Sequence, residues 1–191
     1  MAAQTEKRIS ASQLSVLAVV IITLVALGLG LVLKDSIESR SNPIQNINGI
    51  TGQIPEGWII QDGKGELIFN AYSPFRPYER MTVFLLDGKE GIPLADVASE
   101  RDQQLAASLN SYRILEEQAV ERKGKQGYKV NSAYIDENTQ GIPRVIQGVA
   151  YYFASNSKVL VVTWRTDAAE FDDGLPTFLR VLDSIEYNPG G

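Results

Sequence analysis

The most constraining feature of this chain is an unbroken apolar run from Leu14 to Leu33. The run contains twenty residues without a charged side chain, and fourteen of them are Leu, Ile or Val. A helix of this length spans about 30 Å, which matches the hydrocarbon core of a bilayer, and it satisfies its own backbone hydrogen bonds in lipid. The run therefore predicts an N-terminal transmembrane helix at residues 14–33.

A cleaved secretory signal is the alternative interpretation, because Lys7 and Arg8 precede the run. The hydrophobic region of such signals spans about 7 to 15 residues, and here no small-x-small cleavage site follows the run. We therefore expect an uncleaved anchor. The same basic residues favour a cytoplasmic head at residues 1–13 and a C-terminal domain on the extracytoplasmic side of the membrane, although Lys34 and Arg40 follow the run closely.

Two small residues in the predicted helix, Ala26 and Gly30, are four positions apart. Such pairs allow another helix to approach closely, so they are candidate residues for helix packing in the membrane. Contact with lipid alone is the alternative interpretation.

The chain contains no Cys and no His. Disulfides, thiol catalysis, Ser-His-Asp triads and metal sites built on Cys or His are therefore excluded. Residues 54–191 carry 14 basic and 20 acidic side chains, a net charge of −6, so nucleic acid is not an expected partner.

Residues 34–53 differ from both neighbouring segments, because isolated Ile residues are scattered among Ser, Asn, Gln and Gly. Neither a period of 3.6 nor a period of 2 is sustained, and Asn42-Pro43 and Asn48-Gly49 are typical of turns. This composition predicts a flexible linker. The folded domain is expected over residues 54–191, which suffice for one hydrophobic core.

Short strands alternate with two helices in this domain. Apolar and β-branched runs bounded by turn residues predict strands at 58–61, 66–72, 80–86, 112–121, 128–135, 144–154 and 158–166. A helix is expected after Pro93, although Arg101 and Asp102 interrupt its apolar stripe. A final helix is indicated by the helical spacing of Leu175, Phe178, Leu179, Leu182 and Ile185.

The hairpin formed by the last two strands can be predicted residue by residue. A two-residue turn at Asn156-Ser157 would pair Phe153 with Leu160 and Tyr151 with Val162. Both faces of this hairpin are apolar, so each face needs a cover. The predicted fold class is therefore α+β, an antiparallel sheet flanked by helices in an α/β/α sandwich.

This order of elements resembles a known family. The entry Ile54-Pro55-Glu56-Gly57-Trp58, the early strands, the middle helix, the four-strand meander and the final helix through Leu182-Asp183-Ser184-Ile185 are similar to the Mog1/PsbP-like fold. The resemblance covers about Ile54 to Tyr187 and is best to the bacterial envelope branch of DcrB type. It implies a noncatalytic binding or assembly factor, and no site residue is carried over from it.

The loop from Ser73 to Tyr78 is the candidate partner-binding segment. Two prolines stiffen this loop, which carries Phe75, Arg76 and Tyr78, and aromatic and Arg side chains are enriched at the centres of protein interfaces. The alternative is that Phe75 and Tyr78 fold back as a small core beneath the loop.

Three further motifs have simple local explanations. The basic cluster Arg122, Lys123, Lys125 and Lys129 suits a solvated turn, although acidic lipid or an acidic partner would also suit it. The acidic pairs at 136–137 and 172–173 suit turns and helix capping better than calcium sites. Ser155-Asn156-Ser157-Lys158 matches Ser-x-x-Lys, but the companion motifs of penicillin-binding enzymes are absent from the sequence.

We therefore expect a noncatalytic, single-pass membrane protein whose extracytoplasmic domain binds a protein partner, as an accessory or assembly subunit of a membrane complex. No cofactor is expected. The first alternative is a tethered small-ligand binder, with a pocket between the sheet and a helix lined by residues such as Tyr134, Tyr151 or Trp164. The second is a carboxylate-based hydrolase, which needs two carboxyl groups facing each other across a cleft.

Overall fold

The computed structural model describes residues 17, 19–29, 41–88, 92–137, 142–155 and 157–188. They belong to two units, Met1–Arg40 and Ser41–Gly191. In the first unit, residues 17 and 19–29 are helical. No helix of the described part of the chain is long and apolar enough to cross a membrane. The other positions of the predicted span, the predicted head and Gly30 lie outside the described residues.

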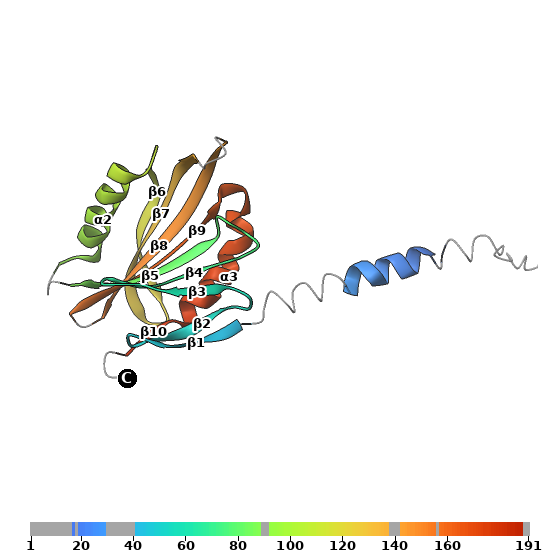
Figure 1. The fold of residues 1–191 in the computed structure, drawn as a ribbon, viewed down its shortest axis with the longest axis horizontal. Coiled ribbons are helices and arrows are strands. Elements are labelled where there is room, and N and C mark those ends of the chain that lie inside the picture. The colour runs from blue at the N-terminus through green and yellow to red at the C-terminus, as the bar shows by residue number, and fades with distance from the viewer. Residues whose placement is uncertain are drawn as a thin grey trace, which may run out of the picture. The chain divides into compact units, whose positions relative to one another are not determined.

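A seven-stranded sheet is the centre of the second unit, with the strand order β3-β4-β5-β9-β8-β7-β6 (Figure 1). Each strand is antiparallel to its neighbours. The strands are β3 (Ile59–Asp62), β4 (Leu67–Tyr72), β5 (Arg80–Asp87), β6 (Arg113–Arg122), β7 (Lys125–Glu137), β8 (Pro143–Ser155) and β9 (Lys158–Asp167). Each of the seven strands predicted in the domain corresponds to one of these.

A smaller sheet corrects the predicted linker. Residues 41–53 are not a flexible tether, because they form β1 (Ser41–Ile47) and most of β2 (Ile50–Pro55), with β10 (Glu186–Tyr187) on the other side of β2. The turn between β1 and β2 is Asn48-Gly49, and both residues have positive φ, as a type I′ hairpin turn requires. A bulge between Ile44 and Ile47 breaks the alternation of apolar residues, which hid the strand pattern.

Two helices cover the main sheet from opposite sides, α2 (Leu94–Ser108) and α3 (Phe171–Ser184) (Figure 1). A short 3-10 helix, η1 (Ala168–Glu170), leads into α3. The buried side chains accordingly form two clusters, one with α3 and one with α2. The predicted α+β sandwich is confirmed, because both faces of the sheet are apolar and each packs against its own helix.

The hairpin of β8 and β9 has the predicted register. Phe153 pairs with Leu160, and Tyr151 pairs with Val162. These four residues belong to the cluster on the α3 side. The alternate residues, including Tyr152, belong to the cluster on the α2 side, so the side-chain period of two divides the core between the two helices.

The α3 helix lies very close to the sheet at Trp164. The indole ring stacks on Phe178 with ring centroids 5.5 Å apart and an angle of 9° between the planes. A Cβ atom added to Gly174 would lie 2.6 Å from the indole ring. The helix therefore reaches this position because residue 174 has no side chain.

Candidate functional site

The predicted contact loop joins β4 to β5 and is closed by its own backbone. Ser73 N donates to Glu79 O at 3.2 Å, and Glu79 N donates to Arg76 O at 2.9 Å. Phe75 lies at the tip of this loop with 89% of its surface exposed. Phe75 therefore does not fold back into a minor core.

The two other predicted contact residues are held against the domain. Arg76 Nη1 lies 3.9 Å from Oε2 of the buried Glu79. Tyr78 is partly buried, and Cζ of Arg144 lies 5.2 Å from the centre of its ring. Phe75 is thus the exposed aromatic residue of the loop, and Arg76 and Tyr78 are its partly buried neighbours.

A cavity of about 290 Å³ lies between α2 and the main sheet, and we call it the α2 cavity. Its helix side consists of Arg101, Asp102 and Leu105, followed by Leu109 after the helix end. Its sheet side includes Asn70, Arg80, Thr82, Phe84, Val130, Ser132, Tyr134, Gly148, Ala150, Tyr152, Thr163 and Arg165. Many of these sheet residues are small, which leaves space beneath the helix.

Asp102 closes one end of the α2 cavity. The side chain is only 5% exposed, because Asp102 follows Ala98 by one turn on the buried face of α2. Its Oδ1 accepts a hydrogen bond of 2.5 Å from the hydroxyl of Tyr112. Among the described residues, its buried Oδ2 has no hydrogen-bond partner, and the same is true of the buried hydroxyl of Tyr152. Buried polar groups without a partner are rare in native proteins.

Burial governs the protonation of this end of the cavity. Removal from water raises the pKa of Asp102, and the hydrogen bond from Tyr112 opposes that rise. Burial also raises the pKa of Tyr152 and of Tyr112, and their hydroxyls therefore keep their protons at neutral pH.

Two arginines form the other end of the α2 cavity. Arg80 on β5 is the direct cross-strand partner of Arg165 on β9, so their side chains leave the same face of the sheet. Arg165 Nη1 donates to the hydroxyl of Tyr134 at 3.0 Å, and Arg80 lies over the ring of Tyr72 at 5.9 Å. Within the described residues, neither guanidinium has a carboxylate within ion-pair distance.

The three aromatic residues named for a ligand pocket have different positions. Tyr134 lines the α2 cavity. Trp164 borders it, but its ring stacks on Phe178 in the core on the other side of the sheet. Tyr151 lies in that same core, 6.2 Å from Phe153 between ring centres. A cavity therefore lies at the predicted location between sheet and helix. Of the three predicted side chains, Tyr134 faces it.

Sequence reasoning missed Arg101, Asp102 and the arginine pair. Arg101 and Asp102 were visible as charged residues that interrupt the apolar stripe of a helix. A buried charge on the apolar face of a helix is unfavourable unless it has a partner. The two charged residues in the stripe were therefore the sequence signal for a polar site beneath this helix. The pairing of Arg80 with Arg165 depends on strand order, which has no local signature.

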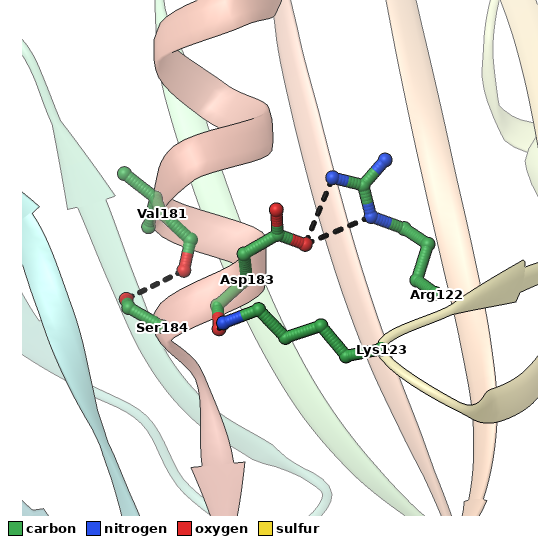
Figure 2. Close-up of polar contacts among 5 residues, drawn as sticks. All are labelled: Arg122, Lys123, Val181, Asp183 and Ser184. Carbon is green, nitrogen blue, oxygen red and sulfur yellow. Dashed lines mark hydrogen bonds and ion pairs between the residues drawn. The ribbon is translucent and has the colours of Figure 1, made fainter.

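A second hollow, of about 350 Å³, lies between the β6–β7 turn and the end of α3. Figure 2 shows two polar contacts here: Arg122 donates to the carboxylate of Asp183, and Lys123 Nζ donates to the backbone oxygen of Asp183 at 2.6 Å. Lys129 pairs with Glu116 at 2.7 Å. Three of the four residues in the basic cluster therefore serve contacts within the domain.

The remaining motifs have structural roles. Lys158 of the Ser-x-x-Lys match pairs with Asp87 across β5 and β9. Glu137 accepts a hydrogen bond from Asn110, and Asp172 and Asp173 lie in the first turn of α3. Within the described ranges, no three Cys, His, Asp or Glu side chains lie close enough together to hold a metal ion.

No protein-family model and no curated protein matches the sequence. Solved structures are similar to it. The cyanobacterial PsbP of Synechocystis sp. PCC 6803 matches with a TM-score of 0.60 and 15% identity, over 78% of this chain and 92% of its own. The Ran-binding protein Mog1p of Saccharomyces cerevisiae matches with a TM-score of 0.55 and 11% identity, over 78% of this chain and 95% of its own.

A third similar structure is protein PA94 of Pseudomonas aeruginosa, with a TM-score of 0.50 and 11% identity, over 79% of this chain and 99% of its own. At these identities the similarity concerns the fold. The domain built on the seven-stranded sheet therefore has a Mog1/PsbP-like fold.

Proposed function

We propose that this protein is a noncatalytic, single-pass membrane protein whose domain at residues 41–191 binds a protein partner on the extracytoplasmic side, as an accessory or assembly subunit of a membrane complex. The observation that carries the proposal is the tip of the β4–β5 loop, where Phe75 is 89% exposed. A large aromatic side chain gains free energy when a partner removes it from water.

The geometry of the loop suits a binding site. Two backbone hydrogen bonds close the loop, and Tyr78 contacts Arg144 of β8, which favours an ordered conformation before a partner arrives. A loop that is already ordered loses little conformational entropy on binding. A fold shared with the Ran-binding protein Mog1p is consistent with a binding role.

The proposed membrane anchor is based on the uncharged apolar run at residues 14–33 of the sequence. Within this run, nine apolar side chains among helical residues 17 and 19–29 are about half exposed or more, and they lie around the whole helix circumference. The hydroxyl of Thr23 is satisfied within the helix by the carbonyl of Val19 at 2.9 Å. A helix that is apolar all round is stable when it is surrounded by protein or lipid. Ala26 remains a candidate for packing another helix there, together with Gly30.

A noncatalytic role is supported by the chemistry available. The chain has no His and no Cys. Asp102 is the one carboxylate among the described residues that line the α2 cavity, so that cavity lacks the carboxyl pair of a hydrolase.

Capture from membranes tests the proposal. The full chain would be crosslinked in intact membranes and purified with its partner, and the same would be done for Phe75→Ala. We expect the variant to lose most of the captured partner. The matched control is Leu115→Ala, because Leu115 is also apolar and is 56% exposed, on edge strand β6.

Three outcomes would contradict this function. The first is equal capture by Phe75→Ala and the unaltered chain. The second is loss of capture by Leu115→Ala instead. The third is recovery of the chain from the soluble fraction without detergent.

A further inference from the structure

The hollow between the β6–β7 turn and the end of α3 has an apolar floor, and we call it the basic hollow. Phe153 and Leu160 contribute this floor from the sheet, and Leu182 and Ile185 contribute it from the end of α3. These four side chains keep 5% to 8% of their surface exposed. Because they line the hollow, an apolar group placed in it would contact them and lose its own contact with water.

The rim of the basic hollow carries a cation that the fold does not use. Arg122 and Lys125 flank the β6–β7 turn as direct cross-strand partners, so their side chains lie on the same face of the sheet. Arg122 pairs with Asp183 at 2.8 Å (Figure 2). Lys125 is exposed, and no carboxylate among the described residues lies within ion-pair distance of it. Its ammonium group can therefore donate to an anion from outside the fold.

The register of β7 and β8 connects this cation to the apolar floor. Gly127 follows Lys125 on the same face of β7 and pairs with Phe153 on β8. A Cβ atom added to Gly127 would lie 2.8 Å from the ring of Phe153, so the ring lies directly against β7. Lys125 thus stands two residues, or about 7 Å of strand, from the floor. One small molecule can contact both.

The charges that line the basic hollow favour an anion. They are three basic side chains, Arg122, Lys123 and Lys125, and two acidic ones, Asp183 and Glu186. The lining therefore carries a net charge of +1, although residues 54–191 carry −6. Because Asp183 is paired with Arg122, Glu186 is the carboxylate that opposes an incoming anion.

The volume of the basic hollow limits the size of its occupant. It is about 350 Å³. At about 30 Å³ for each water-sized group, it holds about a dozen non-hydrogen atoms. A single short alkyl chain with one head group fits this volume, and a phospholipid with two acyl chains exceeds it.

We propose that the basic hollow binds a single-chain alkyl carboxylate, with the chain on the floor formed by Phe153, Leu160 and Leu182 and the carboxylate on Lys125. This site goes beyond the proposed function, because it is separate from the Phe75 loop tip and needs no protein partner. The probe that matches its size and charge is octanoate.

Methyl NMR of the full chain in phosphatidylcholine nanodiscs tests the site. Octanoate should shift the methyl signals of Leu160 and Ile185 in a saturable manner. The signal of Ile146 should not move, because Ile146 is buried at the opposite end of β8 and does not line the hollow. Octan-1-ol has no charge and octylammonium has the opposite charge, so each should bind about fivefold more weakly or worse. These titrations use the unaltered protein and do not depend on the folding of any variant.

Two variants then assign the head group. Lys125→Gln should weaken octanoate binding about fivefold, and Glu186→Gln should strengthen it, because the two substitutions remove opposite charges. Neither should change the binding of octan-1-ol. Both side chains are exposed. Lys64→Gln is the matched control, because Lys64 is also exposed and does not line the hollow.

Four results would overturn the proposal. They are the absence of saturable shifts at Leu160 and Ile185, equal binding of octanoate and octylammonium, octanoate binding that Lys125→Gln does not weaken, and octanoate binding that Glu186→Gln weakens. Nanodiscs that contain phosphatidylglycerol, without octanoate, should leave the two signals in place. The same shifts in those nanodiscs would assign the hollow to bilayer lipid and contradict a single-chain ligand.

Discussion

Arg122 contacts Oδ1 of Asp183 through two nitrogen atoms, Nε at 2.9 Å and Nη2 at 2.8 Å (Figure 2). This contact joins β6 to the last turn of α3, 61 residues later in the chain. Both side chains are partly exposed, by 25% and 34%. Charge screening by water limits what such a pair contributes, but the two contacts favour a single geometry.

A double-mutant cycle measures this contact. Arg122→Ala, Asp183→Ala and the double variant should give a coupling free energy of about 0.5 to 1 kcal/mol in urea unfolding. The coupling should decrease in high salt, because the pair is within reach of ions. A coupling near zero at low salt would show that this ion pair adds nothing measurable to the stability of the domain.

Replacement of Asp102 by Asn should stabilise the domain at neutral pH. Asn keeps an acceptor for Tyr112, and it removes the charge of a carboxylate that burial takes out of water. The expected gain is about 1 kcal/mol in the free energy of unfolding. Urea unfolding at pH 7 measures it, and a loss of stability would contradict the account of this end of the cavity.

The same variant should change the pH dependence of stability. Burial raises the pKa of Asp102 above its value in the unfolded chain, where it is about 3.9. Between the unfolded and the folded pKa of Asp102, the folded state binds more protons than the unfolded state. The stability that Asp102 contributes is therefore fully present below the unfolded pKa and is lost as pH rises through the folded pKa. The advantage of Asp102→Asn should therefore grow as pH rises from 4 and then level off.

Other charged groups also shift the pKa of Asp102, and one of them provides a control for that experiment. Glu117 raises its pKa further, and Arg101 lowers it. Glu117→Gln should leave the stability advantage of Asp102→Asn in place and shift its midpoint to lower pH. An advantage independent of pH would show that Asp102 has an unperturbed pKa.

Gly174→Ala should destabilise the domain even though Ala is the better helix former. The new Cβ would lie 2.6 Å from the indole of Trp164, which is itself fixed between Phe171 and Phe178. Overpacking of this kind costs about 1 to 3 kcal/mol. Thermal unfolding should show a lower Tm for Gly174→Ala, and an unchanged or higher Tm would contradict the close approach of α3.

Much of the fold follows from local sequence signals. The register of β8 and β9 was predictable because a two-residue turn and the alternation of apolar residues each specify the same pairing. The β1–β2 hairpin was missed because its bulge disrupts that alternation, although Asn48-Gly49 is a typical type I′ turn. Giving the Asn48-Gly49 turn signal more weight than the spacing of apolar residues predicts this hairpin.

The candidate sites were less predictable, for physical reasons. The exposure of Phe75 depends on whether a loop closes over its own side chains, and composition does not specify that. The α2 cavity depends on where α2 crosses the sheet and on strands β5 and β9 lying side by side. Both arrangements depend on contacts between residues that are distant in sequence, and local sequence patterns do not specify such contacts.

The most direct test of the central claim is photo-crosslinking from position 75 of the full chain in intact membranes. A photoreactive phenylalanine analogue would replace Phe75 in one protein and Leu115 in the other. We predict a crosslink to one protein partner from position 75 and none from position 115. Crosslinking from position 115 alone, or from neither position, would contradict the claim that this loop is the binding surface.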